Sequence, residues 1–421
     1  MNGTVEIKSV GPIEYVKIGI NRVNLFIGPQ SSGKSTISKI FSQCLYAEKH
    51  YILTGEEKDM YRGLLDFHNF DEGYFSKDSY IHYSSKWLSI TLSFEEGESP
   101  CFVSIYETKE SDERYNNCKV QYLPAERNLL ATIPNLERLG YTRENLRTLV
   151  DDWFEHKDRY KSTRFSVKLA DLAFDYRYDE VGIFKDKERD TIRVNGVSID
   201  LQNASSGQQS VLPLLLIAEG VCDSVLGTKR MLSVQEKRHI ERKISKAKEI
   251  LLSMLDSIHQ WAEDEQTEEY NYYHLEEIWK DIGYSPIYNH THLIIEEPEQ
   301  NLYPSTQRSL TSRLIELLHR DKRPHTLTLT THSLYILYAL NNCMLAGLAK
   351  EKGNEAGIPA LLSSSAIHPS EVSLWAVGDG KVQSLQNPED GLIQQNGLNE
   401  QLRETMDYVY ELLPLAIEPK M

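Results

Sequence analysis

The chain has 421 residues and a formal net charge of −16, and 40% of its residues are hydrophobic. Such a charge opposes binding to nucleic acid or anionic lipid by the molecule as a whole. The longest apolar stretch, residues 211–218, falls far short of the roughly 20 residues that a bilayer span needs. Five scattered cysteines without a C-x-x-C pair argue against a disulfide framework or a structural zinc site. Because no signal-like segment opens the sequence, we expect a cytoplasmic protein without membrane partners.

The predicted elements alternate between strands and helices. Strands are expected at residues 5–7 and 23–27, a helix from about Ser35, strands at 88–92 and 120–123, and a helix from Thr142. A hairpin is expected over 180–201, with strands at 181–184 and 191–194 around a charged turn at 185–190. A long helix begins near Gly207, and buried strands follow at 293–295 and 327–330. A second hairpin around Gly378 and a final helix ended by Pro414 complete the series. This alternation predicts the α/β class.

A charged segment interrupts the second half of the chain. Residues 229–248 contain eight cations against two acidic residues, and residues 249–281 are acidic. Apolar residues recur every three or four positions from Ile240 to Trp261, which predicts a helix with one apolar stripe. We therefore expect a charged helical insert at 229–288 between an N-terminal part at 1–228 and a C-terminal part at 289–421. Solvated charged faces are the simpler interpretation of the basic run.

The strongest chemical signal is the sequence Gly28-Pro29-Gln30-Ser31-Ser32-Gly33-Lys34-Ser35, which matches the phosphate-loop pattern G-x-x-x-x-G-K-[ST]. Glycines let successive backbone N–H groups point at phosphate oxygens, at a helix N-terminus that favours anions. Lys34 would neutralise the β- and γ-phosphates, and the Ser35 hydroxyl would be a ligand of Mg²⁺. A structural strand-to-helix turn is the weaker alternative.

Paired carboxylates end a later apolar strand, at Glu296 and Glu297. Beside a phosphate loop, Glu296 can hold the metal and Glu297 can polarise the attacking water. Taken alone, the pattern is equally typical of a buried strand followed by a solvated acidic loop.

Two further segments carry polar groups at helix starts. Ser205 or Ser206, in the sequence Ala204-Ser205-Ser206-Gly207-Gln208, can cap the helix that follows. His332, at the end of a strand, can sense a γ-phosphate, although a single histidine is more often structural.

The order of these segments resembles an ABC-type ATPase head: a P-loop fold with a mixed sheet flanked by helices, here with a helical insertion between signature and Walker B. The spellings Ser-Ser-Gly-Gln, Glu-Glu-Pro-Glu and Thr-His-Ser resemble the overcoming-lysogenization-defect (OLD) group and ATPase subunits of phage-defence systems such as PARIS, Septu and some retrons. The insert and the last 60 or so residues match no family.

The resemblance implies a role for each matching residue. Glu297 and His332 stand at the catalytic glutamate and switch histidine, and Glu296 with Ser35 at the metal site. The ATP-binding residues implied are Gly28, Gln30, Ser31, Ser32, Gly33, Lys34, Ser35 and Thr36 of the loop, and Ser205, Ser206, Gly207 and Gln208 of the signature. Residues 300–302 fall on the D-loop. The best Q-loop candidate is the strand end at 121–127, and Glu126 and Arg127 within it are added as further ATP-binding residues; a surface ion pair is their alternative.

The resemblance also implies the assembly. In this family the signature of one chain contacts ATP held by its partner, so we expect a homodimer, or a larger assembly of such dimers, that sandwiches ATP and Mg²⁺. The sequence departs from the family pattern at two positions. Ser206 replaces the first glycine of the signature, and Glu296 replaces the usual Walker B aspartate.

Three functions remain open. The first is a regulatory ATPase of an anti-phage defence system that controls a separate effector, a nuclease by preference, since only 89 residues follow His332. The second is a DNA-repair or chromosome-maintenance ATPase of RecF or SMC type, for which the basic run speaks. The third is a nucleotide-gated scaffold with little turnover. DNA, a phage protein or another subunit are the open partners of the insert.

Overall fold

The computed structural model describes residues 3–54, 57, 59–94, 102–107, 115–133, 144–161, 163–181, 187–224, 288–393, 407 and 410–412. The expected insert at 229–288 lies outside the described residues except for Tyr288, and so does most of the expected final helix. Within the described ranges, no helix combines the length and the apolar character that crossing a bilayer requires.

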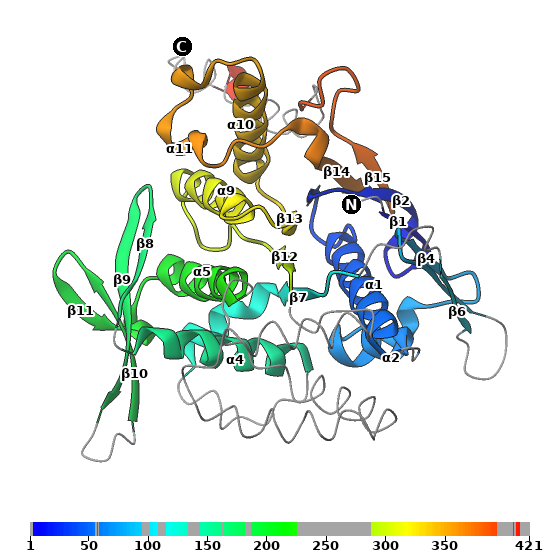
Figure 1. Cartoon of the computed structure of the whole chain (residues 1–421), viewed down its shortest axis with the longest axis horizontal. Helices are drawn as coiled ribbons and strands as arrows, with labels where there is room; N and C mark the ends of the chain where they lie inside the picture. The colour runs from blue at the N-terminus through cyan, green and yellow to red at the C-terminus, as the bar shows by residue number, and fades with distance from the viewer. Residues whose placement is uncertain are drawn as a thin grey trace, which may run out of the picture.

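A six-stranded sheet forms the centre of the molecule (Figure 1). Neighbouring strands are parallel except for the β14–β15 pair, so the sheet is mixed. The strand order is β15 (Lys381–Ser384), β14 (Val372–Gly378), β3 (Val23–Ile27), β13 (Thr326–Thr331), β12 (His290–Glu296) and β7 (Cys118–Leu123). Strands from both sides of the expected insert therefore pair in one sheet.

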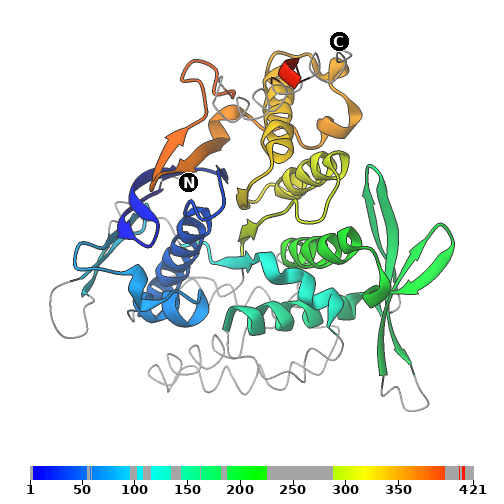
Figure 2. The same cartoon turned by 180° about the vertical axis from the view of Figure 1, so that it is seen from behind.

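Helices cover both faces of this sheet (Figures 1 and 2). Helix α1 (Lys34–Thr54) packs on one face; α4 (Glu144–Lys157), α5 (Ser206–Ser224), α9 (Pro304–His319) and α10 (Leu334–Glu351) pack on the other. Successive strand residues point to opposite faces. Ile294 accordingly joins the core around α1, whereas Leu293 and Ile295 join the core around α5, α9 and α10. The predicted α/β class with a mixed sheet flanked by helices is confirmed.

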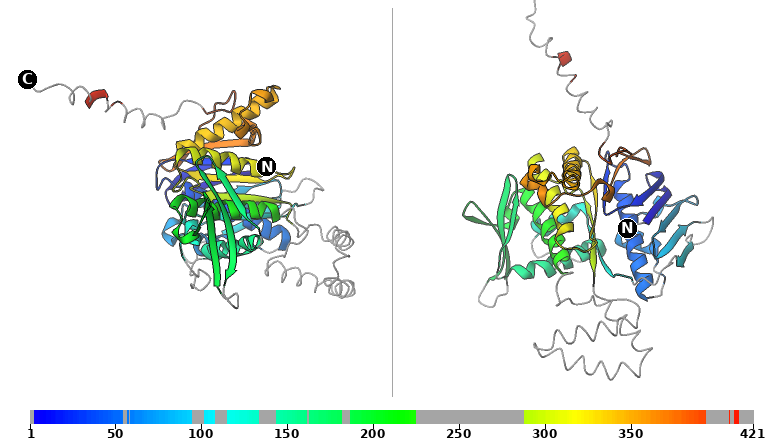
Figure 3. Two further views of the ribbon diagram at one scale, coloured as in Figure 1. Left: turned by 90° about the vertical axis from the view of Figure 1, so that its left-hand side faces the viewer. Right: turned by 45° about the horizontal axis from the view of Figure 1, so that its top comes forward.

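Two antiparallel sheets lie at opposite ends of the molecule (Figures 1 and 3). The first packs over α1 and has the order β2 (Ile13–Ile20), β1 (Gly3–Val10), β4 (Tyr80–Ser84), β5 (Leu88–Ser93) and β6 (Phe102–Glu107). The second has the order β11 (Val197–Asp200), β10 (Lys187–Val194), β9 (Leu172–Val181) and β8 (Phe165–Leu169). Both contain strands that the sequence predicts, but their grouping into separate sheets was not predicted.

The hairpin expected over 180–201 forms with different boundaries. Strand β10 begins at Lys187, so residues 187–190 belong to a strand and the predicted charged turn at 185–190 is wrong over this part. Arg189 lies directly opposite Asp179 of β9. Opposite charges across an antiparallel pair stabilise it, so a run of charges is compatible with a solvent-facing strand.

The short helices are α2 (Met60–Arg62), α3 (Leu129–Thr132) and α11 (Ala360–Ser363), and a 3₁₀ turn at Ala125–Asn128 follows β7.

Candidate nucleotide site

The phosphate loop connects β3 to α1, and both of its glycines are required by geometry. A Cβ on Gly28 would lie 2.1 Å from the Val377 carbonyl oxygen of β14. Gly33 has φ +100°, and a Cβ there would lie 2.4 Å from Ile13 Cδ1. The neighbouring strands thus force a tight loop whose end leads into the first turn of α1, the arrangement that favours anions.

Lys34 lies in the first turn of α1 and is only 5% exposed. Its ammonium donates to the Gly28 carbonyl at 3.0 Å and to the Pro29 carbonyl at 2.6 Å, and lies 3.5 Å from His332 Nδ1. Burial lowers the pKa of Lys34, while the nearby carboxylates of Glu297, Glu299 and Glu296 oppose this change. The lysine is therefore a buried cation whose charge is balanced by acidic groups.

The other loop residues differ in exposure. Gln30 and Ser31 are exposed, Ser32 and Ser35 are half-buried, and Thr36 is buried within α1. The roles of these five residues in nucleotide binding remain predictions.

Glu296 ends β12 and is 5% exposed. Ser38 Oγ lies 3.4 Å from Glu296 Oε1 and 3.1 Å from the Ser35 carbonyl oxygen, so its single hydroxyl proton is within hydrogen-bond reach of both acceptors. Ser38 thereby joins the carboxylate to the first turn of α1, a contact that the sequence analysis missed although Ser38 lies one helical turn after Ser35. The Glu296 carboxylate, at the end of β12, and the Ser35 hydroxyl, in the first turn of α1, are ligands of the kind that Mg²⁺ prefers. The residues present therefore fit this ion.

Glu297 and His332 directly follow the neighbouring strands β12 and β13 and contact each other. Glu297 has φ +43°, an uncommon conformation for a non-glycine residue, and its N–H donates to the Thr330 carbonyl at 2.8 Å. Its Oε1 lies 3.5 Å from His332 Nε2. His332 therefore lies between Lys34 and Glu297, with one ring nitrogen toward each.

Glu299 supports this pair, and the sequence analysis did not single it out. Its Oε1 accepts a hydrogen bond from the backbone N–H of His332 at 2.7 Å. Its Oε2 is buried without a hydrogen-bond partner in the described part of the chain. The position of Glu299 two residues after Glu297 is the signal that could have identified it.

Arg127 lies behind the two glutamates and is fully buried. Its guanidinium donates to the Glu296 carbonyl at 2.6 Å, the Glu297 carbonyl at 2.7 Å and the Pro124 carbonyl at 3.2 Å. Burial lowers its pKa to about 10. As placed, Arg127 positions the end of β12, whereas Glu126 is exposed. That these two residues bind ATP remains a prediction.

The signature segment forms the N-terminus of α5. Ser205 and Gln208 make a reciprocal capping box: the Ser205 N–H donates to Gln208 Oε1 at 3.0 Å, and the Gln208 N–H donates to Ser205 Oγ at 3.4 Å. Ser205 and Ser206 are exposed, and Gln208 is buried. The cap uses the Ser205 and Gln208 side chains and leaves the side chain of Ser206 exposed to solvent.

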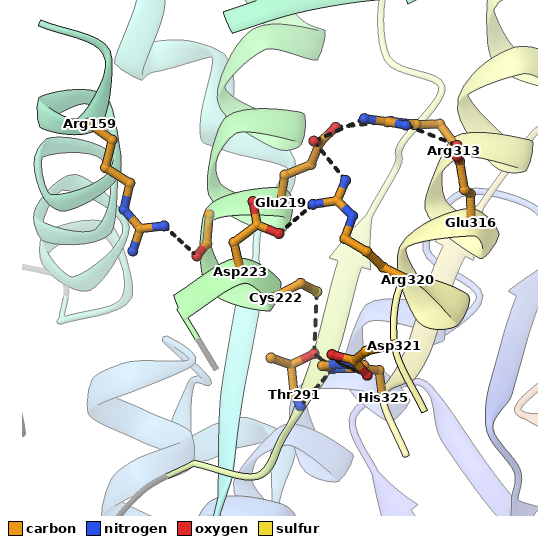
Figure 4. Close-up of polar contacts among 11 residues, drawn as sticks. Arg159, Glu219, Cys222, Asp223, Thr291, Arg313, Glu316, Arg320, Asp321 and His325 are labelled. Atoms are coloured by element: carbon orange, nitrogen blue, oxygen red, sulfur yellow. Dashed lines mark hydrogen bonds and ion pairs between the residues drawn. The ribbon is translucent and has the colours of Figure 1, made fainter. Parts of the chain in front are cut away.

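The start of α5 packs on the D-loop of the same chain. A Cβ on Gly207 would lie 3.0 Å from the Asn301 carbonyl oxygen, and Asn301 Nδ2 donates to Ser210 Oγ at 2.9 Å. Further along, Glu219 of α5 accepts hydrogen bonds from Arg313 and Arg320 at 3.0 to 3.1 Å, as Figure 4 shows. Arg313 lies on α9, and Arg320 directly follows α9. Helix α5 is therefore bonded both to the D-loop and to α9.

The signature and the phosphate loop lie on different faces of the central sheet. Helix α5 belongs to the core on one face and α1 to the core on the other. Among the residues that the structure describes, no hydrogen bond or ion pair joins residues 204–208 to residues 28–36, Glu296 or Glu297.

Comparisons with known proteins give structural similarity only. No protein-family profile and no curated protein matches the chain. The chain is similar to the SMC head domain from Thermotoga maritima (12% identity, TM-score 0.36, 91% of this chain and 98% of that chain covered). It is also similar to the recombination mediator protein RecF-ATPrS in the RecFOR pathway (10% identity, TM-score 0.37, 91% and 98% covered) and to an SmcHead bound to the C-winged helix domain of ScpA (10% identity, TM-score 0.37, 92% and 98% covered). At these TM-scores, the interpretation of the site depends on its own geometry.

Proposed function

We propose that this chain is an ABC-type ATPase head that binds ATP with Mg²⁺ and hydrolyses it between two copies of itself. One observation carries the proposal. The phosphate loop, Glu297 and His332 follow β3, β12 and β13, and these adjacent parallel strands end at the same edge of the sheet. Lys34, His332 and Glu297 form a continuous chain of contacts there, each 3.5 Å long.

The arrangement supports in-line attack of water on a γ-phosphate. Lys34 can turn from the loop carbonyls to the phosphate oxygens, exchanging neutral acceptors for charged ones. Glu297 is positioned to orient the attacking water and receive its proton, with His332 between it and Lys34. Ser35 and Glu296 would hold a Mg²⁺ ion, which would neutralise charge at the phosphates when bound.

A second copy completes the proposed site. The exposed serines of the signature lie at the start of α5, on the face of the sheet away from α1. A helix N-terminus favours the negative charge of a phosphate, but no hydrogen bond or ion pair among the described residues joins that end to the loop. A two-fold dimer would bring the signature of each copy to the nucleotide of the other.

Mixing two inactive variants tests this arrangement. Lys34→Ala removes the loop cation, and Ser206→Glu places a negative charge toward the γ-phosphate while suiting a helix N-terminus. Co-expressed, the two chains should recover about a quarter of the wild-type sites, since half of the dimers are mixed and each mixed dimer has one intact site. Lys34→Ala with Glu297→Gln, both on the same half-site, is the matched control and should recover nothing. An ATPase rate that stays at the level of either variant alone would contradict a shared site.

Two cellular roles accord with this ATPase. The similar structures named above are SMC heads and RecF, which agree better with the DNA-maintenance alternative than with a defence role. The defence role depends on the resemblance of the motif sequences to those of the OLD group. The basic run at 229–248, which favours DNA binding, lies outside the described residues. We therefore propose DNA maintenance together with the defence role as the two cellular candidates.

Salt dependence separates the two candidates. Reversing the charges of Lys237, Arg238, Arg242 and Lys243 should abolish salt-sensitive DNA binding if the chain acts on DNA directly. A chain that binds no DNA at low salt, and whose gene lies beside a nuclease gene, supports control of a separate effector.

A further inference from the structure

A buried cluster of a cysteine and two histidines lies at the end of the central sheet away from the phosphate loop. Cys118 begins β7, and His290 and His292 begin β12. The two strands are parallel, with His290 opposite Cys118. Glu296, at the other end of β12, is six residues from His290, or about 20 Å along the strand. The cluster is therefore separate from the proposed ATP site.

Three donor atoms converge within this cluster. One ligand atom from each of the three residues lies within 4.8 Å of the others, and the residues are 2 to 5% exposed. The Nε2 atoms of His290 and His292 are 3.3 Å apart. Two histidine nitrogens bound tetrahedrally to Zn²⁺ at about 2.0–2.1 Å lie about 3.3–3.4 Å apart. The two imidazoles thus already have the spacing that a tetrahedral ion requires, and the Cys118 sulfur lies within 4.8 Å of a nitrogen of each.

The surroundings orient the donor atoms. His292 Nδ1 lies 2.6 Å from Thr326 Oγ1 on the adjacent strand β13, which directs Nε2 toward the cluster. A hydrogen bond of this kind to the outer nitrogen is typical of histidines that bind metals. His290 Nδ1 is buried without a hydrogen-bond partner in the described part of the chain. The Tyr115 hydroxyl lies 3.7 Å from Cys118 Sγ.

A Zn²⁺ ion bound here would hold Cys118 as a thiolate, so binding would release the thiol proton.

We propose that Cys118, His290 and His292 bind a Zn²⁺ ion, with water in the fourth position. The donor set of one thiolate and two imidazoles is one that Zn²⁺ takes in proteins. The ion would join β7 to β12 beside Tyr288, where the described chain resumes after residue 224. The sequence analysis argued against a zinc site because no C-x-x-C pair is present, and the cysteine and the histidines are more than 170 positions apart.

Cobalt substitution tests the site directly. The full-length protein, stripped with a chelator and titrated with Co²⁺ alone, should bind one ion per chain and show a thiolate-to-cobalt charge-transfer band that Zn²⁺ abolishes. Cys118→Ser should remove the band. Thr326→Val, which loses only the outer hydrogen bond, should weaken Zn²⁺ affinity about 10- to 100-fold.

Cys222 provides a matched control. It is also a buried thiol, but it lies on α5 against Thr291, on the opposite face of β12 (Figure 4). Cys222→Ser should leave the cobalt band and the Zn²⁺ affinity unchanged. Loss of the band in Cys222→Ser but not in Cys118→Ser would overturn the assignment.

X-ray absorption of the zinc-loaded wild type covers the case in which Cys118→Ser does not fold. The proposal requires one sulfur and two imidazole nitrogens around the ion. A shell without sulfur, a shell with several sulfurs, or no bound zinc after equilibration would each refute it. Both measurements are independent of ATP hydrolysis, so a failure of the proposed function leaves this test intact.

Discussion

Replacing Arg127 with methionine would separate the stability of the fold from the positioning of the carboxylates. The guanidinium contacts the backbone carbonyls of Glu296 and Glu297 but not their side chains. Methionine has a similar length, is apolar and donates no hydrogen bond. The variant therefore keeps both carboxylates and removes the two hydrogen bonds that hold their backbone in place, together with the longer bond to the Pro124 carbonyl.

The stability change should be modest because two large contributions oppose each other. Two short hydrogen bonds from a charged donor contribute about 1.5–3 kcal/mol each, so their loss costs about 3–6 kcal/mol. Burial lowers the pKa of Arg127 from its ordinary value to about 10, which corresponds to about 3 kcal/mol that methionine does not lose. The free energy of unfolding should therefore fall by about 0–3 kcal/mol.

The effect on turnover should be larger. Glu297 already has an uncommon backbone conformation, and losing its buried support lets its carboxylate shift. A displacement of about 1 Å can cost about 100-fold in rate. We expect kcat for ATP to fall about 100-fold while the Kd for ATP changes only a few-fold, because Lys34 and the loop are untouched. Arg127→Lys should be intermediate, since one ammonium replaces the planar fork of donors.

Denaturant unfolding, ATP titration and steady-state turnover measure these quantities. Arg159→Met is the control, because it removes a guanidinium bond to the Gly220 carbonyl at 3.2 Å, away from the glutamates (Figure 4). It should leave kcat near the wild-type value. A fully active Arg127→Met protein would refute the positioning role.

Three further predictions concern single side chains. Glu297→Gln keeps the shape of the side chain, but an amide accepts a proton poorly. The rate of ATP hydrolysis should therefore fall about 10²- to 10⁴-fold, and light scattering should show that ATP-bound dimer accumulates. A wild-type rate would show that Glu297 is not the general base. Lys34→Ala removes the cation at the phosphates; ATP binding should vanish in calorimetry, and unchanged affinity would contradict the phosphate loop. His68 is fully buried with both ring nitrogens unpaired in the described part of the chain, and burial lowers its pKa to about 3. Because His68 of the unfolded chain takes up a proton below about pH 6.5, the free energy of unfolding should fall by up to about 4–5 kcal/mol as the pH falls toward 3. His68→Leu should flatten the dependence of Tm on pH over this range. An unchanged slope would show that other groups cause the pH dependence.

Local sequence features predicted much of the fold because their causes are local. The apolar run before Gly28 and the glycines after it predict the strand, the loop and the helix at Lys34, and all three form. The sequence also predicted that Ser205 or Ser206 caps α5; Ser205 does so, in a reciprocal pair with Gln208. The error at residues 187–190 arose because the partner of a charged strand cannot be seen in its own sequence.

The chemical composition of the candidate site was determined by the sequence alone: a loop lysine, two glutamates after a buried strand, and a histidine after another. Only the tertiary structure decided how they meet, because contacts between parallel strands depend on the order of strands in the sheet, and β13 lies between β3 and β12. The same order places Arg127 under both glutamates and brings Cys118 to His290. Such contacts join residues about 170 positions apart, and no local pattern records them.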